Sequence, residues 1–245
     1  MSLIYNEILS KISAGKKLFG LLIDPDKVDH KKCTSIAIKA QKCGVDLILA
    51  GGSLLMSPLN GLINNIKQNC KIPVILFPGS PLQITPDADA ILLLSLISGR
   101  NADFLIGHHV VAAPLLKKSG IEIIPTGYIL VDCGTITSVA YMSNTLPVPY
   151  SKTDIAVATA MAGVMNGMKF IYLEGGSGAQ YPVSTAMISE VKASIDVPLI
   201  VGGGIRTVEQ AEQIYQAGAD IVVVGTAIEK NTEKLEMFCR ASKKF

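Results

Sequence analysis

The sequence predicts a (β/α)8 TIM barrel formed by one domain over residues 1–245, in which the third helix is irregular or missing. Three observations favour this fold. Eight short apolar runs alternate with longer amphipathic stretches, which is typical of parallel strands joined by helices. Hydrophobic residues make up 49% of the chain and charged residues 17%, so a disordered chain is excluded and a large core is expected. The length of 245 residues suits an α/β barrel that forms one domain.

The eight apolar runs are the predicted strands, because short continuous apolar segments are typical of strands buried on both faces. They lie at 18–23, 45–50, 73–77, 88–94, within 120–131, and at 169–173, 197–201 and 220–224. A doubly wound open sheet is the alternative architecture. It is disfavoured because no G-x-G-x-x-G motif follows the first strand.

Amphipathic stretches separate most of these strands. In the first of them Ile36, Ala37 and Ala40 recur at helical spacing, and Gly44 follows as a stop signal. The predicted helices lie at 29–43, 59–68, 101–118, 153–167, 183–194, 208–217 and 226–243.

Two connections break the pattern. Residues 78–87 contain Pro78, Pro81 and Pro86, and proline at this density argues against a full crossover helix. We therefore expect a loop or short extended segment in place of the third helix. Residues 134–152 form a long connection with Pro147 and Pro149, which is a candidate lid or contact surface.

Charge and cysteine content narrow the class of protein. The chain has 22 basic and 20 acidic residues, so its net charge of +2 gives no electrostatic argument for a nucleic-acid partner. Five scattered cysteines without C-x-x-C spacing suggest reduced thiols rather than disulfides or a zinc site. The N-terminal segment carries charged residues too early and too often for a signal peptide. No apolar run approaches the ~20 residues of a membrane-spanning helix. We expect a cytoplasmic protein.

Glycine gathers after the predicted strands, where the active site of such a barrel lies. The seventh and eighth strands are followed by VGGGIRT and VVVGTAI, which contain Gly203, Gly204, Gly225 and Thr226. Glycine allows the backbone to approach an anion closely, and helix N-termini favour negative charge. This pair of loops predicts a phosphate site.

Carboxylates follow two other strands. Asp24 follows the first strand and is a candidate Mg²⁺ ligand, with a hydroxyl oxygen from Ser53 after the second strand. Asp26 is either a further ligand or a cap of the following helix. Glu174 ends the sixth strand and is a candidate general base or hydroxyl-orienting group, or a salt-bridged loop acid. Tyr128 is either core or a ring that faces a developing cation.

The remaining candidates have weaker support. His108 and His109 are neighbours on a predicted helix, so their side chains point about 100° apart. Cys133 has no histidine placed to activate it. Arg100 is a candidate phosphate clamp.

Several segments, in order over nearly the whole chain, resemble the geranylgeranylglyceryl phosphate synthase family of archaeal enzymes and bacterial relatives. The ordered set is more specific than any single piece, and LIDPDK together with YLEGGSGA is the most specific part. The matching segments are LLIDPDK (21–27), GGS (51–53), PVILFPGS (73–80), SGRN (98–101), GYILVDCGTITSVAYMSNT (127–145), YLEGGSGA (172–179), VGGGIRT (201–207) and VVVGTAIE (222–229).

The resemblance implies a Mg²⁺-dependent prenyltransferase. Such enzymes join the C3 hydroxyl of sn-glycerol 1-phosphate to a polyprenyl diphosphate, such as geranylgeranyl diphosphate, and release diphosphate. It also implies a barrel without a regular third helix, a homo-oligomer (dimer or hexamer), and transient contact with a membrane surface.

The resemblance assigns roles to residues as well. Asp24 and Ser53 match the Mg²⁺ ligands, Glu174 and Tyr128 are the catalytic candidates, and Glu174 contacts the glycerol hydroxyls. The glycerol phosphate site is expected to comprise Tyr172, Leu173, Glu174, Gly175, Gly176, Ser177, Gly178, Gly203, Gly204, Gly225 and Thr226.

Two other interpretations remain at this point. Another phosphate-binding barrel, such as a sugar-phosphate isomerase or lyase, would need neither a prenyl groove nor Mg²⁺. A non-catalytic phosphate-binding protein would not need Asp24, Ser53 and Glu174 at three strand ends.

Overall fold

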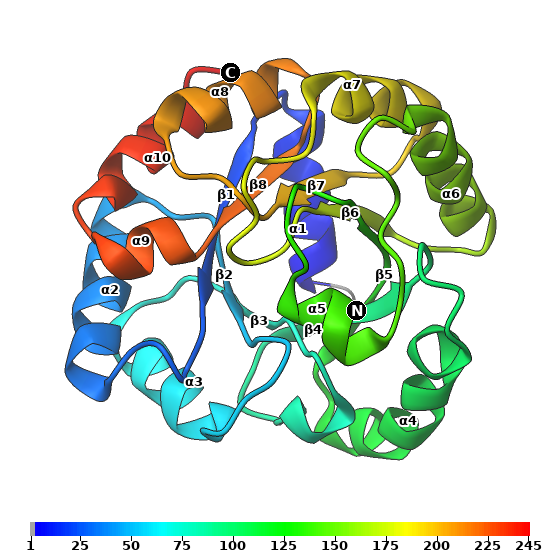
Figure 1. Cartoon of the computed structure of the whole chain (residues 1–245). Coiled ribbons are helices and arrows are strands. Elements are labelled where there is room, and N and C mark those ends of the chain that lie inside the picture. Colours follow the sequence, from blue (N-terminus) through cyan, green and yellow to red (C-terminus); the bar gives the residue numbers. More distant parts are fainter. Residues whose placement is uncertain (1–2) are drawn as a thin grey trace.

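A computed structural model describes residues 3–245 as a closed barrel of eight parallel strands (Figure 1). Each strand pairs with the next along the chain, and β8 pairs with β1 to close the sheet. The (β/α)8 fold is therefore confirmed. The strands are β1 (Leu18–Ile23), β2 (Leu47–Ala50), β3 (Val74–Leu76), β4 (Ala90–Leu96), β5 (Glu122–Leu130), β6 (Phe170–Glu174), β7 (Leu199–Gly202) and β8 (Ile221–Val224).

Helices surround the sheet. In α2, Asp29 accepts a hydrogen bond from the Lys32 amide at the start of the helix, and Gly44 ends the helix in the left-handed conformation. The helices that lie in or near the predicted ranges are α2 (His30–Cys43), α3 (Leu59–Asn69), α4 (His108–Ser119), α6 (Thr153–Met165), α7 (Thr185–Ser194), α8 (Val208–Gln216), α9 (Thr226–Lys230) and α10 (Lys234–Ser242).

The third crossover helix of the barrel, which would connect β3 to β4, is missing, as the prolines in this connection predict. Between β3 and β4 the described chain forms only a short 3-10 helix, η1 (Pro81–Gln83). Two predicted helices differ from expectation. The one at 101–118 begins as a π-helix, η2 (Asp103–Gly107), before α4, and the one at 226–243 is divided into α9 and α10.

Two helices were not predicted. Helix α1 (Leu3–Ser13) covers the N-terminal end of the barrel, where Ile4, Tyr5 and Ile12 pack against the apolar residues inside it. Helix α5 (Ser138–Ser143) lies within the long connection 134–152 and sits over the opposite end (Figure 1). Val139 of α5 packs against the interior core, so this connection covers part of the barrel mouth.

The core has two layers, as strand alternation requires. Side chains such as Leu49, Ile75 and Leu92 fill the barrel interior, and others such as Ile48 and Val222 pack between the sheet and the helices. Among the described residues, no helix is long and apolar enough to cross a bilayer.

Candidate active site

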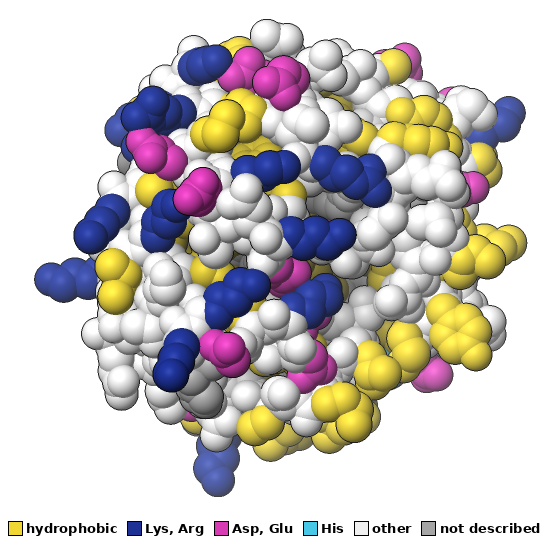
Figure 2. All heavy atoms as spheres, turned by 60° about the vertical axis from the view of Figure 1, so that its left-hand side comes forward, with side chains coloured by type: hydrophobic (Ala, Val, Ile, Leu, Met, Phe, Trp, Pro, Cys, Tyr) yellow, Lys and Arg dark blue, Asp and Glu magenta, His cyan; other side chains and the backbone are white. Residues whose placement is uncertain are grey.

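A wide polar cavity opens at the C-terminal ends of the strands. Its walls come from the loops after β1, β2, β5, β6, β7 and β8, which are distant in sequence. Figure 2 shows Lys and Arg side chains around the hollow in this face, with acidic side chains among them. The basic residues that line the cavity are Lys27, Arg206, Lys230 and Lys234. Four acidic residues line the cavity as well, Asp24, Asp26, Glu174 and Glu229, so it presents charges of both signs.

The loops after β6, β7 and β8 form one corner of this cavity. Gly203 and Gly204 adopt positive φ angles of 83° and 70°. A Cβ on Gly203 would lie 2.3 Å from Glu174 Oε1 and 2.4 Å from the Gly176 amide nitrogen, so only glycine fits between these two loops. Opposite, the Ser177 and Thr226 hydroxyls lie 3.3 Å apart, and α9 begins at Thr226. Two hydroxyls and the glycine-rich backbone of these loops therefore lie together where the sequence predicts phosphate.

Arg206 supports this corner through the backbone. Its guanidinium donates to the carbonyl oxygens of Gln180 and Ala179, each at 2.5 Å. These two contacts hold the loop after β6 against the loop after β7. Lys234 Nζ donates in turn to the Arg206 carbonyl at 3.2 Å, which links α10 to the same loop.

Glu174 lies at the bottom of the cavity with 6% of its surface exposed. Its Oε1 accepts a short hydrogen bond, 2.6 Å, from the Gly176 amide. Burial raises the pKa of this carboxyl to about 7, and the Gly176 amide and the hydroxyls of Tyr172 and Tyr128 oppose the rise. The Tyr172 hydroxyl itself makes no hydrogen bond of good geometry with any residue that the structure describes. A carboxyl with a pKa near neutrality can take up a proton during a reaction.

Three aromatic rings form the floor beside Glu174. Phe77, after β3, lies 5.3 Å from the ring of Tyr172 and 5.9 Å from that of Tyr128, and the two tyrosine rings are 5.4 Å apart. Gly202 leaves room for the Tyr172 hydroxyl, since a Cβ there would lie 2.2 Å from it. Phe77 is not among the predicted site residues, because it ends an apolar run that resembles an ordinary core strand.

Asp24 occupies the opposite side of the cavity. Its Oδ1 accepts a hydrogen bond from the Asp26 amide at 3.0 Å, and its Oδ2 pairs with Lys27 Nζ at 3.0 Å. Ser53 lines the same cavity, and its neighbour Gly52 lies beside the Asp24 carboxylate. The structure also places Glu229 of α9 here, which is not among the predicted site residues. Burial raises the pKa of Glu229, and Lys27 opposes this effect.

Asp26 has a structural role in this arrangement. Its two carboxylate oxygens accept hydrogen bonds from the Met56 and Ser57 amides at 2.7 and 2.8 Å. These bonds lower the pKa of Asp26 and fix the loop between β2 and α3. The cap of α2 is Asp29 instead.

A second, apolar cavity adjoins the first. It lies between the η1 segment, the outer side of β4, and α4, in the space left by the missing helix. The two cavities share Gly52, Ser53, Phe77, Tyr128 and Val139, so the aromatic floor stands at their junction. The apolar cavity is lined chiefly by Pro78, Ile84, Leu93, Phe104, Ala112 and Met142.

Two predicted site residues do not line the polar cavity. The Leu173 side chain belongs to the core layer between the sheet and the helices. Gly175 lies directly behind the corner, against Gly203. The other residues predicted for the glycerol phosphate site do line it: Tyr172, Glu174, Gly176, Ser177, Gly178, Gly203, Gly204, Gly225 and Thr226.

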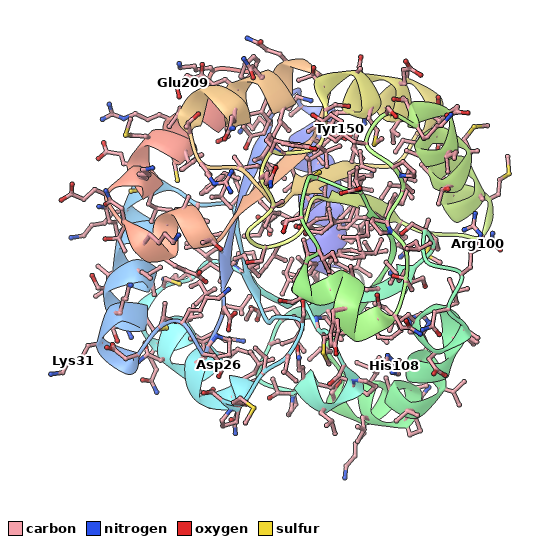
Figure 3. All side chains as sticks on the ribbon, in the orientation of Figure 1. Asp26, Lys31, Arg100, His108, Tyr150 and Glu209 are labelled. Carbon is pink, nitrogen blue, oxygen red and sulfur yellow. The ribbon has the colours of Figure 1, made fainter. Side chains whose placement is uncertain are left out.

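Arg100 is not a phosphate clamp in this structure. It donates to the Ile97 carbonyl and lies on the outside of the barrel (Figure 3). His108 packs edge-on against Phe104 beside the apolar cavity, while His109 bonds the Leu94 carbonyl at 2.8 Å, so the two rings have different targets. Burial raises the pKa of the Cys133 thiol to about 12, which makes it a poor nucleophile.

The fold and site define a (β/α)8 barrel in which a polar cavity adjoins an apolar cavity at the C-terminal ends of the strands. Comparison with known proteins is more specific. The family model of the PcrB family matches residues 11–243. The geranylgeranylglyceryl phosphate synthase of Spirosoma linguale is 51% identical over 233 residues, with 95% of this chain and 94% of that protein covered.

A second relative comes from an archaeon. The geranylgeranylglyceryl phosphate synthase of Pyrococcus horikoshii is 46% identical, with 88% of this chain and 85% of that protein covered. The crystal structure of (S)-3-O-geranylgeranylglyceryl phosphate synthase from Thermoplasma acidophilum with its substrate sn-glycerol-1-phosphate superimposes with a TM-score of 0.94, at 35% identity and full coverage of both chains. The chain belongs to the PcrB family and, within it, to the geranylgeranylglyceryl phosphate synthases.

Proposed function

We propose that this protein is a prenyltransferase that joins the C3 hydroxyl of sn-glycerol 1-phosphate to a polyprenyl diphosphate. The observation that carries the proposal is the junction of the two cavities. A polar pocket suited to a phosphate and an apolar channel suited to a hydrocarbon chain meet at one aromatic floor beside Glu174. A sugar-phosphate isomerase would not need the channel, and a non-catalytic phosphate-binding protein would need neither the channel nor Glu174.

The glycerol phosphate is the better supported of the two substrates. The relative from Thermoplasma acidophilum is described with sn-glycerol-1-phosphate bound, and this chain matches it over its whole length. We assign the phosphate to the corner formed by Gly203, Gly204 and Thr226, and the glycerol hydroxyls to Glu174. The prenyl tail is assigned to the apolar channel, which has the chemistry of the tail in its lining.

The reaction follows from this placement. The glycerol C3 oxygen attacks the first carbon of the prenyl chain, a C–O bond forms, and the bond from that carbon to the diphosphate oxygen breaks. Glu174 takes the proton from the hydroxyl, for which its raised pKa of about 7 is suitable. Positive charge on the allylic carbon would face the rings of Phe77, Tyr128 and Tyr172, whose π-electrons favour a cation.

Mg²⁺ is part of the proposal. The described residues contain no group of three or more His, Cys, Asp or Glu side chains suited to a metal. Mg²⁺ fits nevertheless, because it commonly takes one or two carboxylates together with waters and substrate phosphates. Asp24 and Ser53 would hold it, and when bound it would neutralise charge on the leaving diphosphate.

Three further expectations concern the whole protein. Exposed apolar side chains on α4 and α6, among them Val110, Val111 and Met165, support a homo-oligomer. A monomer found by light scattering would contradict this expectation.

The exposed side chains of Met56 and Leu82, in the loops after β2 and β3, support transient contact with a membrane, which vesicle sedimentation can test. A cytoplasmic location is proposed from the unpaired cysteines.

A product assay tests the function. Purified protein is incubated with Mg²⁺, radiolabelled sn-glycerol 1-phosphate and prenyl diphosphates of increasing length. We expect label to enter a lipid phase with one length preferred, and EDTA to abolish transfer. The mirror-image sn-glycerol 3-phosphate is the control for the glycerol site. Folded protein that transfers label with none of the lengths would contradict the proposal.

A further inference from the structure

We infer that Lys27 is a displaceable counter-ion shared by Asp24 and Glu229, and that Glu229 promotes divalent-cation binding by accepting Lys27 when the cation takes its place at Asp24. Glu229 is thus a positioning residue that acts through Lys27. The inference rests on the proposed function only in taking Asp24 as the cation's ligand.

The buried carboxylate of Glu229 has one oxygen without a hydrogen-bond partner. The side chain is 8% exposed, and its Oε1 accepts a hydrogen bond from the Asp24 amide at 3.3 Å. No described residue forms a hydrogen bond to Oε2, and the nearest cation is Lys27 Nζ at 3.9 Å. An unpartnered buried carboxylate oxygen is costly, so this position favours the arrival of a positive group.

Lys27 forms an ion pair with the Asp24 carboxylate oxygen that a cation would bind. The Asp26 amide on Asp24 Oδ1 is fixed by the backbone, whereas the Lys27 ammonium, 3.0 Å from Oδ2, can move, so Oδ2 is the oxygen that can be cleared for a metal. A divalent cation at Oδ2 would meet an ammonium group at contact distance, where like charges repel strongly. The cation must therefore displace Lys27.

The structure offers Lys27 a second partner within reach. Its side chain is 45% exposed and flexible, and Glu229 Oε2 is already within ion-pair distance. Lys32 does not fill this role, because it donates to the backbone carbonyl of Glu229 at 2.6 Å rather than to the carboxylate. A small movement of Lys27 from Asp24 towards Glu229 would free Oδ2 and satisfy Oε2 together.

A double-mutant cycle on metal binding tests the inference without any prenyl substrate. Mn²⁺ is titrated into wild type, Glu229→Gln, Lys27→Met and the double variant, and free Mn²⁺ is measured by electron paramagnetic resonance. We expect Glu229→Gln to weaken Mn²⁺ binding on the order of tenfold, since Lys27 then competes fully for Asp24. Lys27→Met should tighten binding, and Glu229→Gln should have almost no effect in its presence.

Two results would overturn the inference. Glu229→Gln that binds Mn²⁺ as tightly as wild type would leave the residue a purely structural role. An equal loss with and without Lys27 would mean that Glu229 acts on the cation directly. Glu209→Gln, on the exposed outer side of α8 (Figure 3), is the matched control and should bind as wild type does.

Two controls distinguish a failure of this inference from misfolding of a variant and from failure of the proposed function. Circular dichroism of the metal-free variants checks that Glu229→Gln folds. If it does not, Lys27→Met alone decides, because Lys27 is half-exposed and its loss should tighten Mn²⁺ binding; unchanged or weaker binding would overturn the inference. Failure of wild type in the product assay would instead contradict the proposed function and leave the metal cycle intact.

Discussion

Glu174 shows how the fold can raise the pKa of a single carboxyl at the expense of stability. The end of β6 places its carboxyl under the loops after β6 and β7, where 6% of its surface is exposed. One backbone amide and two nearby tyrosine hydroxyls favour the charged form, but the loss of water outweighs them and the pKa rises from 4.5 to about 7. The ionised form is therefore destabilised in the folded protein.

Glu174→Gln should remove both activity and this cost. The folded pKa lies above the unfolded value, so the carboxyl lowers stability increasingly as pH rises from about 4.5 through 7. We expect the variant to be more stable than wild type at pH 8, by up to about 3 kcal/mol, and equal to it near pH 4.5. Prenyl transfer should be lost.

Urea unfolding at the two pH values measures this difference, with the exposed Glu190→Gln of α7 as the control. Equal stability of Glu174→Gln and wild type at pH 8 would contradict the account of Glu174. Full turnover by the folded variant would remove it from the role of base.

The sequence was informative about residues at strand ends and less so elsewhere. Asp24, Ser53 and Glu174 were predicted because each ends an apolar run or follows one within three residues, and all three line the polar cavity. Glu229 could not be found this way, since it lies five residues beyond β8 on α9. Its pairing with Lys27 depends on the contact between the first and last strands, which local pattern does not reveal.

At the scale of elements, strong local signals gave the right structure and weak ones did not. Proline density predicted the missing helix between β3 and β4, because proline is excluded from helix interiors whatever its tertiary context. The break between α9 and α10 carries no such signal. There the Glu233 amide donates to Asn231 Oδ1, a polar turn that an amphipathic pattern passes over.

The first turn of helix α1 is capped by a residue distant in sequence, which a local sequence pattern does not reveal. The Glu122 carboxylate at the start of β5 accepts hydrogen bonds from the Ile4 and Tyr5 amides at 2.7 and 3.0 Å. These are first-turn amides with no partner inside the helix. Glu122 therefore attaches α1 to the end of the barrel far from the active site.

Glu122→Ala should loosen α1 without affecting catalysis. We expect a loss of about 1 kcal/mol in stability, the usual effect of a lost helix cap, and faster hydrogen exchange at the Ile4 and Tyr5 amides. Glu7→Ala, which removes only a surface ion pair of the same helix with Lys11, is the control. Unchanged exchange in Glu122→Ala would show that packing alone holds α1.

At the scale of the whole molecule, closure of the barrel and loss of one helix together create the site. Closure brings the loop after β1 beside α9, so Asp24, Lys27 and Glu229 meet although about 200 residues separate them. The missing helix leaves an apolar channel against β4 that reaches the same aromatic floor. On the proposed function, the length of this cavity would set which prenyl chain fits, because packed apolar walls tolerate little overlap.

Ala112 gives a way to shorten the channel from within. This residue of α4 is 4% exposed and lines the apolar cavity, whereas its neighbour Ala113 faces solvent on the same helix. Ala112→Phe would fill space that we assign to the prenyl tail, so the preferred prenyl diphosphate should become shorter while the KM for sn-glycerol 1-phosphate stays the same. Ala113→Phe should keep the wild-type preference. The product assay across prenyl lengths measures both variants. An unchanged length preference in folded Ala112→Phe would mean that the tail lies outside this channel, even if transfer itself is observed.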